Sequence, residues 1–282
     1  MKKFTSKSSI LGLVLCGLVA CSNSNEVDKP NTTHEKPDAT TSHQVVEAYT
    51  ERYVVGVDTS YPPFTFRDSV GTPAGFEIEI LQAIAKDQKF GLDLVSAERN
   101  SLYPSLEEGH YQILAASLKS SPERLQKSEF TDGFAQSHHA ILSRKDKVAK
   151  SGKELAGLGV TAVQEATNSQ KRLEELGAEM SLHPSVFAAF KAFMAGEADH
   201  VTGDSVALGY HLKEHAGSQI TDYVMSPFDD AGNKEIAFAV QKGNSELLGK
   251  MNAGLANIKA NGTYDQIYNK YFSDQNASVN QK

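Results

Sequence analysis

The chain has 282 residues, of which 40% are hydrophobic and 22% charged, with 21 glycines, two cysteines and no tryptophan. This composition is that of an ordinary globular protein and excludes a disordered chain, a collagen-like repeat or a small disulfide scaffold. The formal net charge is −7, from 28 basic and 35 acidic side chains. A net acidic surface argues against nucleic-acid binding, and the length is sufficient for two domains with separate cores.

The amino-terminal residues have the pattern of an export signal. Three lysines among the first seven residues precede a continuous apolar run at 10–20, which is too short to cross a bilayer of about 30 Å as a helix. The run ends in Leu-Val-Ala-Cys, which resembles the lipobox of bacterial lipoproteins. On this interpretation residues 1–20 are a signal peptide and Cys21 carries acyl chains such as palmitate. The alternative is an ordinary cleaved signal with an incidental cysteine.

Residues 21–48 are predicted to form a flexible tether behind the lipidated Cys21. The stretch is rich in Ser, Asn, Thr, Glu, Lys, Pro, Asp and His and has almost no large apolar side chain, so it buries too little surface to offset the entropy of ordering. We therefore expect a protein of the bacterial cell envelope that faces the periplasm or the cell exterior. Its only contact with the membrane would be the lipid anchor.

The remainder of the chain alternates short β-branched runs with helical patterns, the rhythm of a mainly parallel α/β sheet. The expected strands lie at 53–57, 92–95, 112–116, 159–163, 200–203 and 235–241. The expected helices lie near 78–85, before Gly109, after the Ser-Pro start at 121–122, at 168–176, 185–195 and 205–215, and in two segments of 245–272 separated at Asn261-Gly262. Open α/β sheets bind ligands at the carboxyl ends of their strands.

Several motifs occur in a fixed order between residues 53 and 273. They are Gly-Val-Asp-Thr-Ser-Tyr-Pro-Pro-Phe at 56–64, Gly-Phe-Glu-Ile-Glu-Ile at 75–80, Ser-Pro-Glu-Arg at 121–124, Phe-Thr-Asp at 130–132, Ala-Asp-His-Val-Thr-Gly-Asp at 198–204, Asn-Gly-Thr-Tyr at 261–264 and Lys-Tyr-Phe at 270–272. In their order and spacing the chain resembles the family 3 extracellular solute-binding proteins, which deliver polar amino acids to ABC importers. The resemblance implies the two-lobe periplasmic-binding-protein fold of type II, with two hinge strands and the ligand in the interlobe cleft.

The resemblance also implies a division of the chain and a set of partners. Lobe 1 would consist of residues 49–135 plus 231–275, lobe 2 of residues 136–230, and residues 276–282 would be a flexible tail. We expect a monomer that has no catalytic residue, no cofactor and no metal. Its partners would be a free polar amino acid and the permease of an ABC importer.

Carried over by matched position, four residues would hold the charged ends of the ligand. Arg124 would clamp the α-carboxylate, since a guanidinium fork gives two parallel charge-assisted bonds. Thr167 and Asn168 would assist from a helix start, where N–H dipoles favour an anion. Asp204 would hold the α-ammonium. The alternatives are a solvated first-turn arginine at 124 and a helix cap at 204.

Selectivity for the ligand side chain would come from the first-lobe loops, where Asp58 and Tyr61 match family positions that meet this side chain; turn capping and core packing are the alternatives for these two. Ser117 is a further expected ligand-binding residue. Arg99 stands where many relatives have a stacking aromatic residue, and Lys119 stands where they usually have a small hydroxyl residue. Two cations against Asp58 favour an acidic or amide side chain on the ligand. Asp58 alone would favour a cationic one, as would solvent-facing positions for Arg99 and Lys119, so both alternatives stay open.

Other functions are less well supported by the sequence. Gly-Asp-Ser at 203–205 resembles the nucleophile block of GDSL hydrolases, but the Asp-x-x-His pair of that family does not follow. His211 and His215 have the spacing of two metal ligands on a helix, yet surface histidines are the better interpretation because no third ligand is suggested. The main rival is a dehydratase of the prephenate or arogenate type on the same fold. A sensor or surface-interaction protein is a third class.

Overall fold

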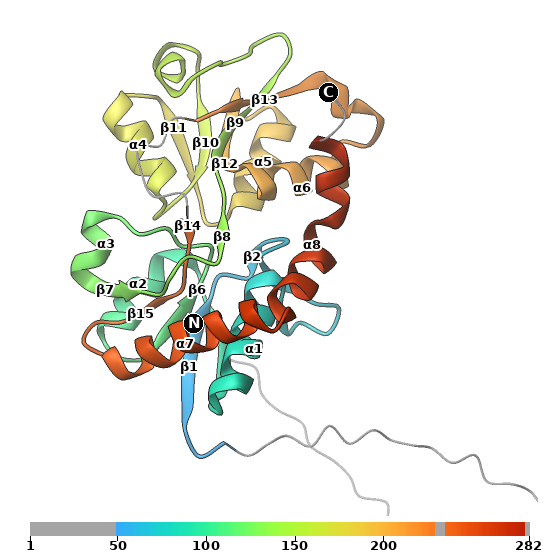
Figure 1. Cartoon of the computed structure of the whole chain (residues 1–282). Helices are drawn as coiled ribbons and strands as arrows, with labels where there is room; N and C mark the ends of the chain where they lie inside the picture. The colour runs from blue at the N-terminus through green and yellow to red at the C-terminus, as the bar shows by residue number, and fades with distance from the viewer. Residues whose placement is uncertain (1–48, 229–234, 280–282) are drawn as a thin grey trace, which may run out of the picture. The chain divides into compact units, whose positions relative to one another are not determined.

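The computed structural model describes residues 49–228 and 235–279, and the chain from Glu47 onward is one compact unit. The predicted signal peptide, Cys21 and the tether lie outside the described residues. Within the described ranges, no helix combines the length and the hydropathy that crossing a membrane requires. The described part contains two lobes, each with its own five-stranded sheet (Figure 1).

The sheet of the first lobe combines parallel and antiparallel strands. In order across the sheet they are β5 (Gly91–Ser96), β1 (Arg52–Val57), β6 (Ile113–Ala115), β15 (Ala239–Gln241) and β7 (Ser128–Phe130). Strands β5, β1 and β6 are parallel, and β15 is antiparallel to both of its neighbours. Gly56 in β1 is required by its surroundings, because a Cβ there would lie 2.6 Å from the ring of Tyr111.

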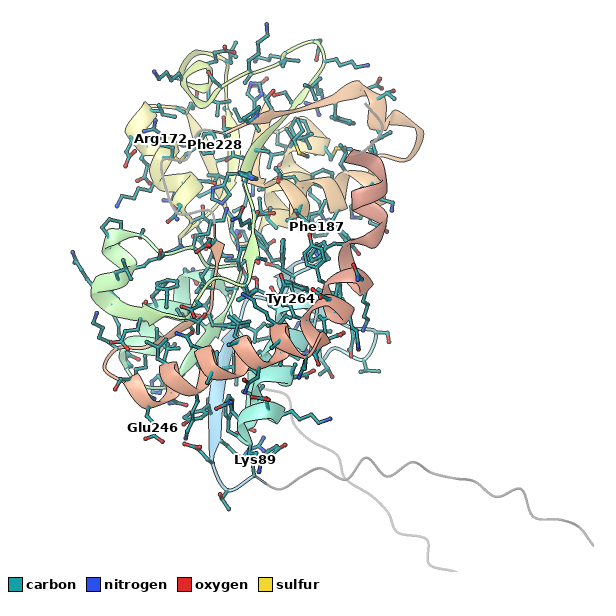
Figure 2. All side chains as sticks on the ribbon, viewed as in Figure 1. Lys89, Arg172, Phe187, Phe228, Glu246 and Tyr264 are labelled. Carbon is teal, nitrogen blue, oxygen red and sulfur yellow. The ribbon has the colours of Figure 1, made fainter. Side chains whose placement is uncertain are left out.

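Helices cover both faces of this sheet. The helices of the lobe are α1 (Phe76–Gln88), α2 (Arg99–Glu107), α3 (Pro122–Lys127), α7 (Ser245–Ala260) and α8 (Thr263–Val279). Val55 and Val57 belong to the core beneath α1 and α7, whereas Leu114 packs under α2 with Leu102 and Leu106. Aromatic rings of α8, among them Tyr264 (Figure 2), pack edge-on around Phe76 and fix this helix to α1.

The second lobe repeats the arrangement on a second sheet. Its strands, in order, are β11 (Met180–His183), β10 (Thr161–Gln164), β12 (His200–Asp204), β9 (His139–Arg144) and β13 (Tyr223–Pro227). Its helices are η1 (Gly152–Gly157), α4 (Asn168–Leu176), α5 (Val186–Ala195), α6 (Ser205–His215) and η2 (Gly217–Asp222). Helices α5 and α6 pack on one face of the sheet, and α4 and η1 share a separate apolar cluster with Ile141 and Val163.

Two short strands join the lobes, and a small sheet lies beside the first one. The joining strands, β8 (Ala135–Gln136) and β14 (Glu235–Ile236), pair with each other in antiparallel register. The small sheet consists of β2 (Ser60–Tyr61), β3 (Thr65–Arg67) and β4 (Pro73–Ala74). The single strand predicted at 235–241 is wrong, because β14 and β15 belong to different sheets and Ala237 donates to the carbonyl of Leu118 between them.

The predicted fold class, a type II two-lobe α/β architecture, is confirmed. The predicted helices at 168–176 and 205–215 coincide with α4 and α6, whose first turns are capped by the side chains of Thr167 and Asp204. The interpretation of His211 as a surface histidine is wrong. Its side chain is buried and lies against the rings of Phe187 and Phe190, and this burial lowers its pKa from 6.5 to about 4.

Candidate functional site

Most polar residues predicted for the ligand site lie at strand ends and helix starts of the two lobes, and Gln164, which was not predicted, lies among them. In the first lobe Asp58 follows β1, and Ser117 follows β6. In the second lobe Gln164 ends β10 and Asp204 ends β12. The Nε2 atom of Gln164 donates to Asp58 Oδ2 at 3.0 Å. This bond joins strand ends of the two lobes directly, in the position where open α/β sheets bind ligands.

A small cavity of ≈ 20 Å³ lies at this junction. It is lined by Tyr61, Arg99, Ser117, Lys119, Arg124, His139, Thr167 and Asn168. This set contains every predicted ligand residue except Asp58 and Asp204, and these two carboxylates pair with Arg99 and Lys119 of the lining. His139 also lines the cavity and was not predicted. A cavity of this size admits about one water molecule. An amino acid can therefore enter only when the lobes move apart.

Asp58 and Arg99 form a buried ion pair on the first-lobe side of the cavity. The Nε atom of Arg99 lies 3.1 Å from Asp58 Oδ2, and both side chains are about 5% exposed or less. Arg99 also donates to the carbonyl of Ala116 at 2.7 Å and stacks over the ring of Tyr61. The alternative of a solvent-facing Arg99 is therefore wrong. Because Asp58 neutralises Arg99, this arginine adds no surplus positive charge to the site.

Asp204 contacts both a helix terminus and Lys119. Its Oδ1 atom accepts from the N–H groups of Val206 at 2.9 Å and Ala207 at 3.3 Å, so the helix-cap interpretation holds for one oxygen. Its Oδ2 atom lies 4.0 Å from Lys119 Nζ, with both side chains buried. Burial raises the pKa of Asp204, while the charges of Lys119 and His139 act in the opposite direction. Lys119, like Arg99, does not point to solvent.

Arg124 lies at the boundary of the lobes and contacts carbonyl oxygens. It is on α3, whose cap is Ser121 as predicted, and its guanidinium donates to Lys119 O at 2.9 Å and across the cleft to Ala166 O at 3.4 Å. The guanidinium also lies over the ring of Tyr103. Desolvation lowers the pKa of Arg124. Among the described residues, no carboxylate forms an ion pair with it, so its charge is left for an anion.

The start of α4 faces Arg124 from the second lobe. The hydroxyl of Thr167 accepts from Gln170 N at 3.1 Å and donates to Gln164 O at 2.8 Å. The hydroxyl proton is therefore engaged, and the first N–H groups of α4 are the groups that can face an anion. Two non-glycine residues in left-handed conformation flank this region, Ser117 with φ 49° and Ala166 with φ 56°. Such conformations concentrate at ligand sites.

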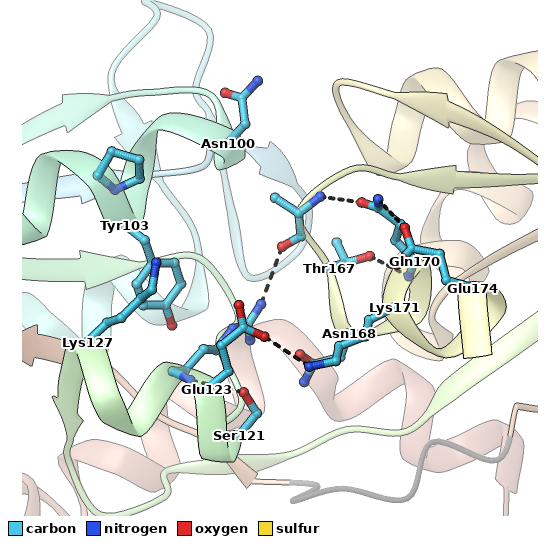
Figure 3. A pocket seen from close by; sticks show the side chains of 13 residues that line it. Asn100, Tyr103, Ser121, Glu123, Lys127, Thr167, Asn168, Gln170, Lys171 and Glu174 are labelled. Atoms are coloured by element: carbon cyan, nitrogen blue, oxygen red, sulfur yellow. Dashed lines mark hydrogen bonds and ion pairs between the residues drawn. The ribbon is translucent and has the colours of Figure 1, made fainter.

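A larger pocket of ≈ 500 Å³ opens outside the small cavity (Figure 3). It shares Arg124, Thr167 and Asn168 with the cavity, so Arg124 stands between the two spaces. An ion pair between Lys171 and Glu123 at 3.0 Å crosses it and joins the lobes (Figure 3). We expect this pocket to be the mouth through which a solute reaches the cavity.

Sequence reasoning missed a buried carboxyl group behind the cavity. Glu77, near the start of α1, is fully buried, and its Oε1 accepts from the hydroxyl of Ser117 at 2.6 Å. Burial raises its pKa from 4.5 to about 7. The Gly-Phe-Glu motif contains this residue, but nothing local distinguishes a buried glutamate from a surface one in the first turn of a helix. Gln164 was missed as well, although it directly follows a buried strand.

No metal centre accompanies these residues in the described ranges, where no group of three or more His, Cys, Asp and Glu side chains could hold an ion. His211 and His215 lie 6.1 Å apart between ring centroids and are stacked. Their environment is aromatic, from Phe187 and Phe190. This packing explains the four-residue spacing without a metal.

Comparison with known proteins identifies the class that this fold and cleft define. Residues 53–274 match the model of the bacterial extracellular solute-binding proteins, family 3, and the chain belongs to this family. It is 30% identical over 227 residues to the L-arginine-binding protein of Pseudomonas aeruginosa, covering 78% of this chain and 87% of that protein. It is also 30% identical over 233 residues to the ABC transporter glutamine-binding protein GlnH of Bacillus subtilis, covering 80% and 83%.

Solved structures give the same result for the fold. The crystal structure of the ancestral amino acid-binding protein AncCDT-1, a precursor of cyclohexadienyl dehydratase, matches with a TM-score of 0.69 at 30% identity, over 78% of this chain and 95% of that one. Binding proteins for different amino acids, and a precursor of an enzyme, thus share this architecture. Specificity for the side chain of a bound amino acid therefore depends on the residues of the cleft and not on the fold.

Proposed function

We propose that this chain captures a free polar amino acid between its two lobes and delivers it to the permease of an ABC importer. The observation that carries the proposal is Arg124, a half-buried guanidinium that lines the cavity opposite the start of α4 and has carbonyl oxygens as its partners. This arrangement gives a carboxylate two donors from the first lobe and helix N–H groups from the second. Names of several relatives, such as those for arginine and glutamine, support the amino-acid class.

For the ligand side chain we propose a preference for an acidic or amide group. Among the described residues, Asp58 pairs with Arg99, Asp204 faces Lys119, and Arg124 has no carboxylate in an ion pair, so these five groups together carry one net positive charge. A ligand with a net negative charge balances this total, whereas a cationic side chain would bring a further unbalanced cation into a buried space. The charge balance therefore supports glutamate, aspartate or their amides over arginine and histidine.

Calorimetric titration of the purified protein tests both parts of the proposal. The panel consists of glutamate, aspartate, glutamine, arginine and histidine, after removal of carried-over ligand by unfolding and refolding. Micromolar or tighter binding of an acidic amino acid or an amide is the expected result. Tightest binding of arginine would refute the side-chain preference, and no heat with any common amino acid would refute the function.

The rival function is a dehydratase on the same fold, and one observation favours it. Glu77, with its pKa of about 7, is the kind of group that acts as a general acid near neutral pH. Its carboxyl is fully buried and reaches the cavity only through Ser117, so it cannot contact a reacting atom in this arrangement. We therefore propose a protein without enzymatic activity. Formation of phenylpyruvate from prephenate in the presence of the purified protein would overturn this.

We further propose that a lipid on Cys21 anchors the protein and that it acts as a monomer. The support is the Leu-Val-Ala-Cys sequence behind the apolar run, with a polar stretch after it. Mass spectrometry of the amino-terminal peptide from membranes tests the lipid. A Cys21→Ser variant should move from the membrane fraction to the soluble fraction, and a peptide without acyl chains would contradict the anchor. Light scattering tests the monomer.

A further inference from the structure

Glu77 is a fully buried carboxyl group whose hydrogen-bond partner is a neutral hydroxyl. Its Oε1 atom accepts from Ser117 at 2.6 Å. Burial raises its pKa; of the charged groups around it, Arg99 on α2 lowers this pKa and Asp58 after β1 raises it, and these two pair with each other. A buried carboxylate without a cation of its own destabilises a fold. The stability of the lobe therefore does not explain why an ionisable group lies here.

The partner of Glu77 lies in a strained turn at the cavity. Ser117 lines the cavity and has a φ of 49°, a left-handed conformation that a non-glycine residue keeps only where its surroundings hold it. The carbonyl of the preceding residue accepts from Arg99 at 2.7 Å, and that of the following residue accepts from Ala237 N at 2.9 Å. Glu77 holds the strained residue itself, because both the hydroxyl and the backbone N–H of Ser117 bond to its carboxylate.

The bond to Glu77 determines what the hydroxyl of Ser117 can offer a ligand. A hydroxyl has one proton and two lone pairs, and a carboxylate only accepts. The proton of Ser117 is therefore committed to Glu77, and towards the cavity the Oγ atom can only accept. Every free amino acid carries a matching donor, its α-ammonium. An ammonium N–H that bonds to Ser117 completes a chain of hydrogen bonds from the ligand to the buried carboxylate, in which each bond strengthens the next.

We propose that Glu77 is a positioning residue of the ligand site, which holds the hydroxyl of Ser117 as an acceptor for the ligand ammonium. This inference rests on the proposed function and assigns a residue behind the same site. Asp204 is the acceptor expected on the second lobe, and Ser117 gives the ammonium an acceptor on the first. Ionised Glu77 strengthens the bond more than protonated Glu77 does, so the affinity should rise as the pH rises through its pKa of about 7.

Calorimetric titrations of wild-type protein and Glu77→Gln with glutamate, aspartate, glutamine, arginine and histidine test this role. The variant keeps an acceptor for Ser117 but not the charge. It should bind like the wild type at about pH 5.5 and about threefold or more weakly at about pH 8. The ratio of the two affinities cancels the titration of the ligand and of other groups, such as His139 of the cavity lining.

The matched control is Glu79→Gln, the same change two residues further along α1. Glu79 pairs with Lys270 at the surface and does not line the cavity. Its ratio to the wild type should therefore be the same at both pH values.

A double-mutant cycle separates positioning from a general structural role. Glu77→Met removes the acceptor and keeps an unbranched side chain, and Ser117→Ala removes the hydroxyl. Each should weaken binding about tenfold at about pH 8, and the double variant should bind no more weakly than the weaker single variant. Glu77→Gln should unfold less readily than the wild type at this pH and yet bind less tightly, an opposition that a purely structural residue does not show.

The outcomes separate this inference from the function on which it rests. A ratio of wild type to Glu77→Gln that is equal at both pH values, or additive losses of about a hundredfold in the double variant, overturns the role of Glu77 while amino-acid binding stands. No binding of any of the five amino acids by the wild type overturns the proposed function instead. If thermal unfolding shows that Glu77→Met does not fold, the comparison with Glu77→Gln decides alone.

Discussion

The buried carboxyl of Glu77 makes the stability of the first lobe depend on pH in a direction opposite to that of an ion-paired acid such as Glu123, whose pKa Lys171 lowers. The pKa of Glu77 is about 7 in the folded chain, against 4.5 for a glutamate in water. Between these values the folded state binds a proton that the unfolded state does not. The stabilising contribution is therefore complete below pH 4.5 and is lost as the pH rises through 7.

The magnitude follows from the two pKa values. A difference of about 2.5 units, at about 1.4 kcal/mol per unit, gives an upper limit of about 3 kcal/mol. The variant Glu77→Gln has nearly the same shape, keeps an oxygen that can accept from Ser117 and does not titrate. We expect it to match the wild type in free energy of unfolding near pH 4.5 and to exceed it by up to about 3 kcal/mol near pH 8.

Urea unfolding followed by circular dichroism at half-unit steps from about pH 4.5 to 8 measures this difference. Ser117→Ala provides a second comparison, because the hydrogen bond from Ser117 lowers the pKa of Glu77. Its loss should move the pH at which stability declines above 7. A constant difference between Glu77→Gln and the wild type over the whole range would refute the reasoning, since it would mean that Glu77 titrates alike in both states.

Three further predictions concern other parts of the molecule. His211, whose pKa burial lowers from 6.5 to about 4, should destabilise the fold by up to about 3 kcal/mol as the pH falls through this window, and His211→Phe should abolish that decline in urea unfolding. Arg124→Lys keeps the charge but loses the fork, so calorimetry should show binding about 30- to 100-fold weaker; a change below about threefold contradicts the clamp. Gly254→Val should lower the unfolding free energy by about 1–3 kcal/mol, because even a Cβ would lie 2.9 Å from Ile84 on α1.

The elements predicted most accurately from the sequence are those whose start and end signals lie next to them in the chain. Helix α4 begins after Thr167 and ends at Gly177 in left-handed conformation, and both signals are visible in the sequence. The interruption between β14 and β15 has no comparable signal. It exists because one segment pairs with β8 in the hinge and then with β6 and β7 in the first-lobe sheet. Only the partners of a strand, which are distant in sequence, reveal such a division.

It was also easier to predict which residues belong to the candidate site than to predict which of their charged groups pair with each other. Positions matched to the family resemblance named Arg99, Lys119 and Arg124, and all three line one cavity. The partner of each charge depends on distances across the fold. Asp58 and Arg99 are 41 residues apart and form a pair, which removes one of the two cations that the sequence pattern counted as surplus. The burial of His211 depends in the same way on Phe187 and Phe190 of another helix.

The contacts across the cleft also determine how much of the binding energy a ligand can realise. Gln164 bonds to Asp58, Arg124 to the carbonyl of Ala166, and Lys119 lies near Asp204, so groups of the protein make the contacts between lobes that a ligand would otherwise make. A ligand shifts the equilibrium between open and closed forms only by the difference between its own contacts and those that it replaces. The affinity for the ligand is therefore governed by the protein groups whose interaction becomes most favourable when the ligand replaces their partner in the other lobe. Arg124, which exchanges neutral carbonyl partners for a carboxylate, gains most.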